Sequence, residues 1–178
     1  MKRISLFGLV PLVVLMFCVV HGCTKEKPVT SGEQPGTTVL EGCVDLGLPS
    51  GTKWKNENEL NPNDPDFGFY TYEEAIAAFG GMVPTKDQLN ELKTECQWTW
   101  TREGFKVTGP NGKHIIMTAP GYRGCNGEIY DVSFCGFYWS STANGTTDAW
   151  ILRFDAGTQG MFNNRQCNGG SVRLVQNN

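Results

Sequence analysis

Histidine is almost absent from this sequence of 178 residues. It contains only His21 and His114, which excludes a metal site built from several histidines. His21 falls in the N-terminal apolar segment described below, so a serine–histidine catalytic pair would have to use His114. His114 lies in an apolar segment with a strand-like pattern, and we expect it to be an exposed strand residue because triad geometry is so specific.

Positive charge is also scarce. The chain has 15 Lys and Arg against 18 Asp and Glu, a formal net charge of -3. It therefore lacks a basic field that would attract nucleic acid, and no nucleic-acid partner is expected. Disorder is not expected either, because 39% hydrophobic residues and 11% aromatic residues suffice for the core of one domain.

The longest apolar run lies at the N-terminus. Two basic residues precede ISLFGLVPLVVLMFCVV, and Gly22 and Cys23 follow soon after. A basic start, an apolar stretch and a small residue before cysteine are typical of a bacterial lipoprotein signal peptide. We therefore predict a signal peptide at residues 1–22 and membrane attachment through a lipid on Cys23. The alternatives are an ordinary secretory signal and a transmembrane anchor, for which this run, interrupted by Pro11, is marginal.

Residues 23–40 read CTKEKPVTSGEQPGTTVL, a polar segment without periodicity. Its composition is typical of a flexible tether. Lys25 and Glu26 resemble the short charged signals that send lipoproteins of the Bacteroides group to the outer face. We therefore expect an outer-membrane lipoprotein at the cell surface, with the periplasmic face as the alternative.

Residues 41–178 carry the patterns of one folded domain. Thr71 with Glu74, and Thr85 with Gln88, match the capping box that starts a helix. The segments that follow have apolar faces, formed by Tyr72, Ala75, Ile76 and Phe79 and then by Leu89, Leu92 and Cys96. Because Cys96 shares such a face, we expect it to be a buried, reduced thiol.

The pattern changes to period two after residue 98. Residues 105–108 and 113–118 flank a Gly-Pro-Asn-Gly turn, which predicts a hairpin. Further short strands are predicted at residues 137–142, 149–155, 160–163 and 171–175. Helices followed by antiparallel strands indicate an α+β fold.

The stretch FYWSST at residues 137–142 is open to two interpretations. Ser140 or Ser141 would need a neighbouring base to act as a nucleophile, and no G-x-S-x-G motif is present. A strand is the better interpretation, with Phe137 and Trp139 on one side, Tyr138 and Ser140 on the other, and serine hydroxyls bonded to backbone. We predict no catalytic residue and no cofactor.

Two further polar regions bear on ligand binding. Asp64 and Asp66 do not have the spacing of a calcium loop, so we expect a solvated loop and no metal site. Donors and acceptors interrupt the later strands and suggest exposed turns that contact a ligand: Asn144, Thr146, Thr147, Asp148, Asn163, Asn164, Arg165 and Gln166. The alternative is that these residues only solvate turns.

The chain also carries an ordered set of short motifs: VDLGLPSGTKW, VPTKDQLNEL, CQWTWT, GFKVTGPNGKHI, APGYRG, GFYWSST, AWILRFDAG and SVRLV. Together they resemble the Fibrobacter succinogenes major paralogous domain and the related DUF1566 group of bacterial surface domains. The resemblance implies a C-type-lectin-like fold, with two helices on a twisted, mostly antiparallel sheet. NPNDPDFGFYTYEEAI replaces a longer insert of that family, and the calcium-binding motifs of true C-type lectins are absent from the domain.

Cysteine pairing stays open at this point. Cys125 with Cys135 would close the shortest loop, whereas the implied fold would bring the strands of Cys135 and Cys167 together.

A fold alone does not determine function. We expect a non-catalytic binding or adhesion module that recognises a glycan or a protein. The alternatives are an assembly subunit of a surface polymer and an exported enzyme of the formylglycine-generating class.

Overall fold

The computed structural model describes residues 40–177. The predicted signal peptide (1–22), the lipidation at Cys23 and the predicted tether (23–40), apart from Leu40, lie outside the described residues. A compact unit spans Thr37–Asn178 and takes in all of them. Neither helix of the described part has the length and apolar content needed to cross a membrane.

Two helices form where the capping boxes predict them. In α1 (Tyr72–Phe79), the Thr71 hydroxyl accepts from the Glu74 N–H, and the Glu74 carboxylate accepts from the Thr71 N–H at 2.8 Å. Thr85 and Gln88 make the same pair of bonds at the start of α2 (Lys86–Glu95). A short 3-10 turn, η1 (Gly80–Met82), lies between the helices.

The strands form small antiparallel sheets, so the fold class is α+β as predicted. One sheet has the order β1 (Cys43–Asp45), β2 (Lys53–Lys55), β11 (Val175–Gln176), and another β3 (Gln97–Thr101), β4 (Gly104–Thr108), β5 (His114–Thr118). A third sheet has the order β10 (Gln159–Arg165), β9 (Asp148–Asp155), β8 (Cys135–Asn144). β6 (Tyr122–Arg123) and β7 (Ile129–Tyr130) form a separate hairpin.

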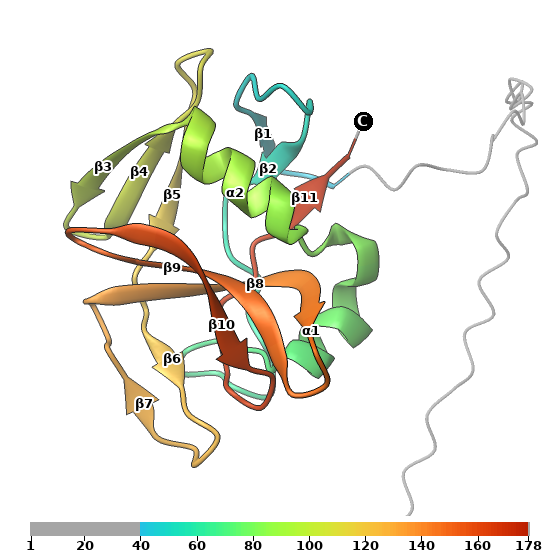
Figure 1. Cartoon of the computed structure of the whole chain (residues 1–178). Helices are drawn as coiled ribbons and strands as arrows, with labels where there is room; N and C mark the ends of the chain where they lie inside the picture. The colour runs from blue at the N-terminus through green and yellow to red at the C-terminus, as the bar shows by residue number, and fades with distance from the viewer. Residues whose placement is uncertain (1–39, 178) are drawn as a thin grey trace, which may run out of the picture. The chain divides into compact units, whose positions relative to one another are not determined.

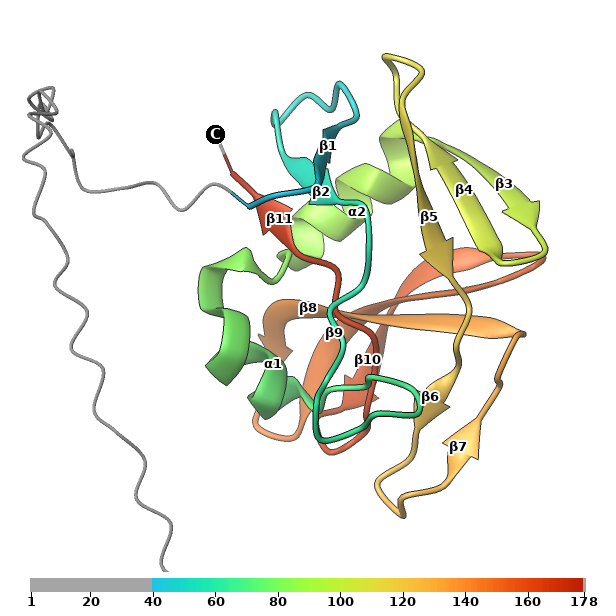
Figure 2. The same ribbon diagram turned by 180° about the vertical axis from the view of Figure 1, so that it is seen from behind.

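The sheets occupy two halves of the unit, with α2 crossing between them (Figure 1). The β1-β2-β11 and β3-β4-β5 sheets lie in one half, and β8, β9, β10 and the β6–β7 hairpin lie in the other. A long irregular segment from β2 to α1 runs down the back of the unit (Figure 2). The two ends of the described chain meet, because the Leu40 N–H donates to the Gln176 side chain at 3.2 Å.

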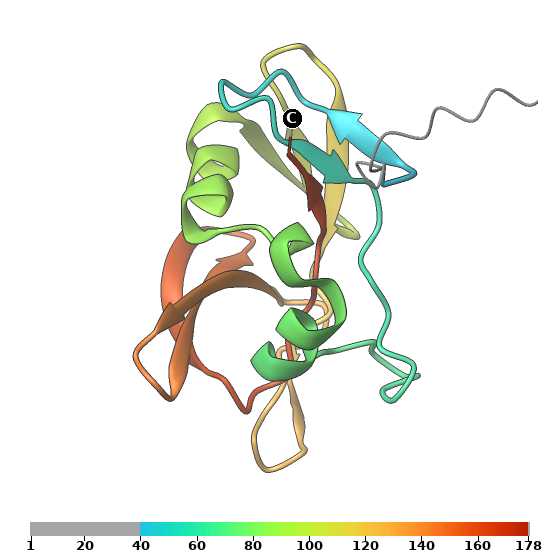
Figure 3. The ribbon, with the colours of Figure 1, turned by 90° about the vertical axis from the view of Figure 1, so that its right-hand side faces the viewer.

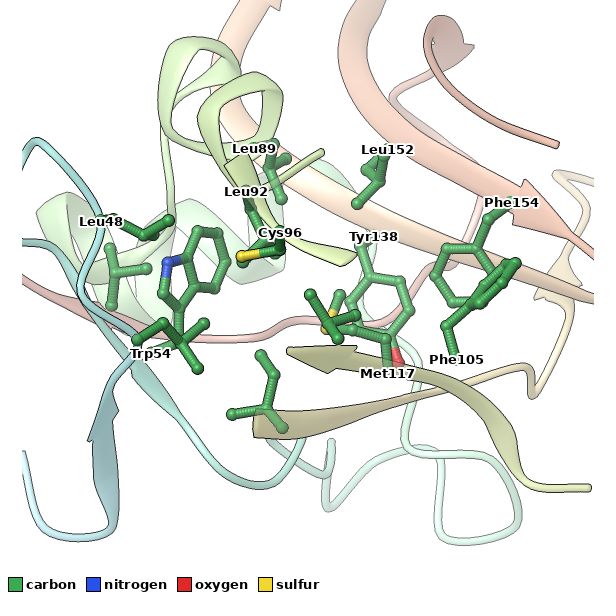
Figure 4. Close-up of a cluster of buried hydrophobic side chains, with 14 of the residues drawn as sticks. Leu48, Trp54, Leu89, Leu92, Cys96, Phe105, Met117, Tyr138, Leu152 and Phe154 are labelled. Carbon is green, nitrogen blue, oxygen red and sulfur yellow. The ribbon is translucent and has the colours of Figure 1, made fainter. Parts of the chain in front are cut away.

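Two apolar cores lie on opposite sides of β8. Tyr138 joins the core that contains Trp54, Cys96 and Phe154 (Figure 4), whereas Phe137 and Trp139 join the second core. This alternation confirms the strand predicted for FYWSST.

The two serines of that stretch make hydrogen bonds to backbone. The buried Ser140 hydroxyl donates to the Trp150 carbonyl at 2.8 Å, and the Ser141 hydroxyl donates to the Pro84 carbonyl at 3.4 Å. This confirms the role predicted for them.

The strand predicted at 171–175 is largely wrong. β11 begins only at Val175, and Ser171 and Val172 make isolated bridges to Tyr138 and Glu59. The segment passes between the two halves of the unit, so its backbone bonds go to different elements in turn rather than to one neighbouring strand.

Cys96 is buried and unpaired, as predicted. Burial, together with the nearby carboxylates of Glu91 and Glu95, raises the pKa of its thiol to about 11. At pH 8 only about one thousandth of this thiol is ionised, and the thiolate is the reactive form. We therefore expect N-ethylmaleimide to label Cys96 far more slowly than the half-buried Cys43, as measured by peptide mass mapping. Equal labelling rates, or Cys96 in a disulfide, would refute this assignment.

Candidate functional site

The structure brings the two predicted polar stretches together. Asp148 at the start of β9 lies opposite Arg165 in β10, and Trp150 lies opposite Asn163. The Gln166 N–H donates to the Thr147 carbonyl at 2.8 Å and closes this edge of the sheet. Thr146 and Thr147 are exposed in the turn between β8 and β9, and Asn144 ends β8. Residues from both predicted stretches therefore share one surface.

Asn163, Asn164 and Arg165 do not lie at a turn, as the sequence suggested, but are the last three residues of β10. β10 is the outer strand of its sheet. Polar and charged residues are common on an edge strand because one side of it faces solvent and they discourage pairing with other chains. The polar run therefore forms the last part of an edge strand rather than the turn that follows it.

Side chains alternate along β10, so the three residues divide between two faces. Asn163 and Arg165 share a face with their partners Trp150 and Asp148. The Lys86 ammonium lies 3.3 Å from the centre of the Trp150 ring, a cation–π contact. We call these five residues the Trp150 face: Lys86, Asp148, Trp150, Asn163 and Arg165.

Three side chains of the Trp150 face have no polar partner. Within residues 40–177, no hydrogen bond or ion pair uses the side chain of Asp148, Asn163 or Arg165. Asn163 and Arg165 are exposed. The side-chain donors and acceptors of Asn163 and Arg165 are therefore free to form hydrogen bonds with a ligand.

Asn164 and Gln166 are occupied within the chain. The side-chain oxygen of Asn164 accepts a hydrogen bond from the side-chain nitrogen of Asn168 at 2.6 Å. The side-chain oxygen of Asn168 in turn accepts from the backbone N–H of Cys125 at 2.9 Å. The Gln166 amide donates to the Asp148 carbonyl at 2.9 Å. These two side chains hold the loop after β10 in place, although the buried side-chain nitrogen of Asn164 makes no hydrogen bond within residues 40–177. At this end of β10, Asn163 and Arg165 are the side chains that are both exposed and unbonded.

The serine–histidine alternative finds no support in the geometry. Ser140 is buried and bonded to backbone, as described above. His114 is exposed at the start of β5, as predicted, and pairs with Thr108 in a different sheet from β8. The structure does not bring these groups into one site.

Asp64 is not solvated, contrary to expectation. It is buried, and its carboxylate accepts from the Arg123 guanidinium at 2.6 Å and from the Phe69 N–H at 3.2 Å. The sequence could not indicate this, because Asp64 and Arg123 are distant in the chain. Among the described residues, no group of three His, Cys, Asp or Glu side chains is placed to hold a metal ion.

Both disulfide pairings considered from the sequence are wrong. Cys125 pairs with Cys167, and Cys135 is a buried free thiol. The bridge joins the β6–β7 hairpin to the turn after β10, where Arg123 and Gly169 also exchange backbone hydrogen bonds. Cys135 instead lies 3.5 Å from an Arg153 nitrogen. Burial raises the pKa of the Cys135 thiol.

No match was found among protein-family models, curated proteins or solved structures.

One site was missed by the sequence reasoning. A groove of about 420 Å³ opens beside the buried Arg173. The strand predicted at residues 171–175 includes this arginine, which lies between the apolar residues Val172 and Leu174. An arginine flanked by core residues on both sides was the available signal, since a buried guanidinium requires a dedicated set of acceptors.

Proposed function

We propose that this chain is a lipid-anchored cell-surface module that binds a glycan or a protein through the Trp150 face, without catalysis. The observation that supports this most strongly is the pair of exposed, unbonded side chains, Asn163 and Arg165, held on a paired strand. Polar groups fixed on a sheet keep their positions before a ligand arrives, which lowers the entropic cost of binding.

The chemistry of the Trp150 face suits hydroxyl and carboxylate groups. Arg165 offers a planar fork of N–H donors, which suits carboxylates and paired hydroxyls. Asn163 offers both a donor and an acceptor. Trp150 adds an amphipathic ring that Lys86 holds in place. Together these groups match a polar ligand with one apolar face, which describes both sugars and many peptide side chains.

The position of the β8–β9 turn suits display from a tether. Leu40 and β11 lie at one end of the unit, and the β8–β9 turn lies at the other (Figures 1 and 3). A tether joined at Leu40 would leave the β8–β9 turn, with the exposed Thr146 and Thr147, on the side away from its attachment point. We propose that the fold is C-type-lectin-like and that the chain belongs with the Fibrobacter-type surface domains, because its helices pack on antiparallel strands and its ordered motifs resemble theirs.

The location has a direct test. Growth with a palmitate analogue should label the wild-type chain and should not label a Cys23→Ala variant, because the thiol of Cys23 is the proposed attachment point. Labelling is read by in-gel fluorescence, and protease treatment of intact cells then distinguishes surface from periplasmic display. Labelling that persists in Cys23→Ala would contradict the lipoprotein assignment.

The binding function is tested by presenting the soluble unit, residues 37–178, to arrays of glycans and extracellular proteins. We expect saturable binding to a restricted set of ligands. Absence of binding on both arrays would contradict the proposed function. Capture of the unit by immobilised copies of itself, and by nothing else, would indicate the assembly role instead.

A further inference from the structure

The groove beside Arg173 has a floor that is already hydrogen-bonded. Arg173 is 1% exposed, and its guanidinium donates to the carbonyls of Lys55, Asn56 and Ile116 and to the side chain of Asn58. These contacts use four of its five N–H groups. Burial lowers the pKa of Arg173, while nearby Tyr138, Glu57 and Glu59 raise it. An arginine stays protonated in this setting, so the floor carries a fixed positive charge.

The neutral groups of the floor are fixed as well. The Asn58 amide donates to the hydroxyls of Thr118 and Tyr138, each at 3.1 Å. The Tyr138 hydroxyl donates to the Thr118 carbonyl at 3.0 Å. Thr118 therefore reaches the groove with its hydroxyl held between the Asn58 amide and the Tyr138 hydroxyl, which is the pre-organisation that a ligand site requires.

The rim of the groove has the opposite character. Glu57 and Glu103 are exposed, and within the described residues neither carboxylate makes a hydrogen bond or an ion pair. Leu60 is 74% exposed and lies with Ile116 among the residues that line the groove. The groove thus presents two free carboxylates and two apolar side chains above a fixed cationic and hydroxyl-bearing floor.

The charges oppose an anionic ligand and favour a cation only in part. An anion would be repelled by Glu57 and Glu103 and would find only one remaining N–H on Arg173. A cation would be attracted by the rim and repelled by the guanidinium in the floor. A neutral ring with several hydroxyls avoids both costs, since its hydroxyls donate to the carboxylates and to the remaining lone pair of the Thr118 hydroxyl, whose own proton is used toward Tyr138. Its C–H face would pack on Leu60 and Ile116.

We propose that this groove is a binding site for neutral sugars, with one hexose ring seated between Leu60 and the Glu57 and Glu103 carboxylates. The groove is formed by other elements than the Trp150 face. This proposal therefore goes beyond the function proposed above and does not depend on that function. Its volume of about 420 Å³ is within the range of small-ligand sites, about 300–1,000 Å³.

The test is a titration followed by amide NMR on residues 37–178, a compact unit of their own. The probes are the methyl glycosides of glucose, galactose and mannose, each paired with the uronic acid of the same ring at equal ionic strength. We expect at least one methyl glycoside to shift the amides of Asn58, Ile116 and Thr118 saturably. Its uronic acid should bind at least about threefold more weakly because of the rim carboxylates.

Three double variants test whether the rim carboxylates of the groove carry this binding. Glu57→Gln with Glu103→Gln keeps the shape of the rim, and we expect it to weaken binding of the methyl glycoside and abolish the preference over the uronic acid. Glu73→Gln with Glu95→Gln makes the same charge change at exposed sites outside the groove and should bind like the wild type. Asn163→Ala with Arg165→Ala should also leave this titration unchanged.

The proposal would be overturned by any of three results. These are no saturable shift at the groove with any methyl glycoside, tighter binding of the uronic acids, or wild-type behaviour of the Glu57→Gln/Glu103→Gln variant. A failure of the arrays described above would not bear on this result, because the titration reports on Asn58, Ile116 and Thr118 alone.

Discussion

Replacing Arg173 by Met should destabilise the domain by at least about 3 kcal/mol. The substitution keeps an apolar stem of similar length but removes every donor from the floor of the groove. Three backbone carbonyls and the Asn58 side chain then lose their partner. Each buried acceptor left without one costs about 1–3 kcal/mol, and water entering from the groove offsets part of the sum. A typical domain has about 5–15 kcal/mol of stability in total.

The measurement is urea denaturation followed by tryptophan fluorescence. Arg153→Met is the matched control, because Arg153 is only half buried and its ion pair with Asp155 is long, at 3.7 Å. Such a pair contributes about 1 kcal/mol or less. We expect Arg173→Lys to resemble Arg173→Met, since a single ammonium cannot reach both the acceptors of residues 55–58 and the Ile116 carbonyl. Equal stability of the Arg173→Met and Arg153→Met variants would contradict the structural role given to Arg173.

Removing the Cys125–Cys167 bridge is the second change with a large expected effect. The two cysteines are separated by 42 residues. A crosslink closing a loop of that length restricts the unfolded chain by about 4 kcal/mol in the chain-entropy model. The Cys125→Ser/Cys167→Ser variant should therefore unfold at markedly lower urea concentration than the oxidised wild type.

The reduced wild type provides a control for this variant, because it loses the bridge without any substitution. Both should show the same loss, and the loss should be absent from Cys135→Ser, whose thiol is free. Non-reducing peptide mapping gives an independent check. A bridge that includes Cys135, or equal stability with and without reductant, would contradict the pairing.

Local sequence signals predicted the parts of the fold that local bonds determine. The capping boxes at Thr71 and Thr85 involve residues three apart, and both form. The hairpin over β4 and β5 and the alternation of Phe137, Tyr138 and Trp139 are likewise set by neighbouring residues. These signals do not depend on how the rest of the chain folds, and the helices, the hairpin and the strand could therefore be predicted from them.

The wrong predictions all concern contacts between distant segments. The local sequence around Asp64 is typical of a solvated loop, and its burial depends on the distant Arg123. The disulfide between Cys125 and Cys167 forms only because the β6–β7 hairpin packs against the turn after β10. The acceptors of Arg173 come from two distant segments, residues 55–58 and Ile116 in β5, so no local pattern reveals its structural role. The candidate site was predicted in part for the same reason. Both polar stretches were found, but pairing with β9 decides that Asn163 and Arg165 share a face and Asn164 does not.

The central claim is that the Trp150 face carries ligand binding, and one titration tests it most directly. A ligand from the arrays is titrated, by calorimetry, into wild-type residues 37–178 and into Asn163→Ala/Arg165→Ala. Loss of polar contacts worth about 1–3 kcal/mol should weaken binding at least about tenfold, with little change in Tm because both side chains are unbonded. Lys113→Ala/His114→Ala, exposed at the far hairpin, should bind like the wild type. Wild-type affinity in a folded Asn163→Ala/Arg165→Ala variant would contradict the claim.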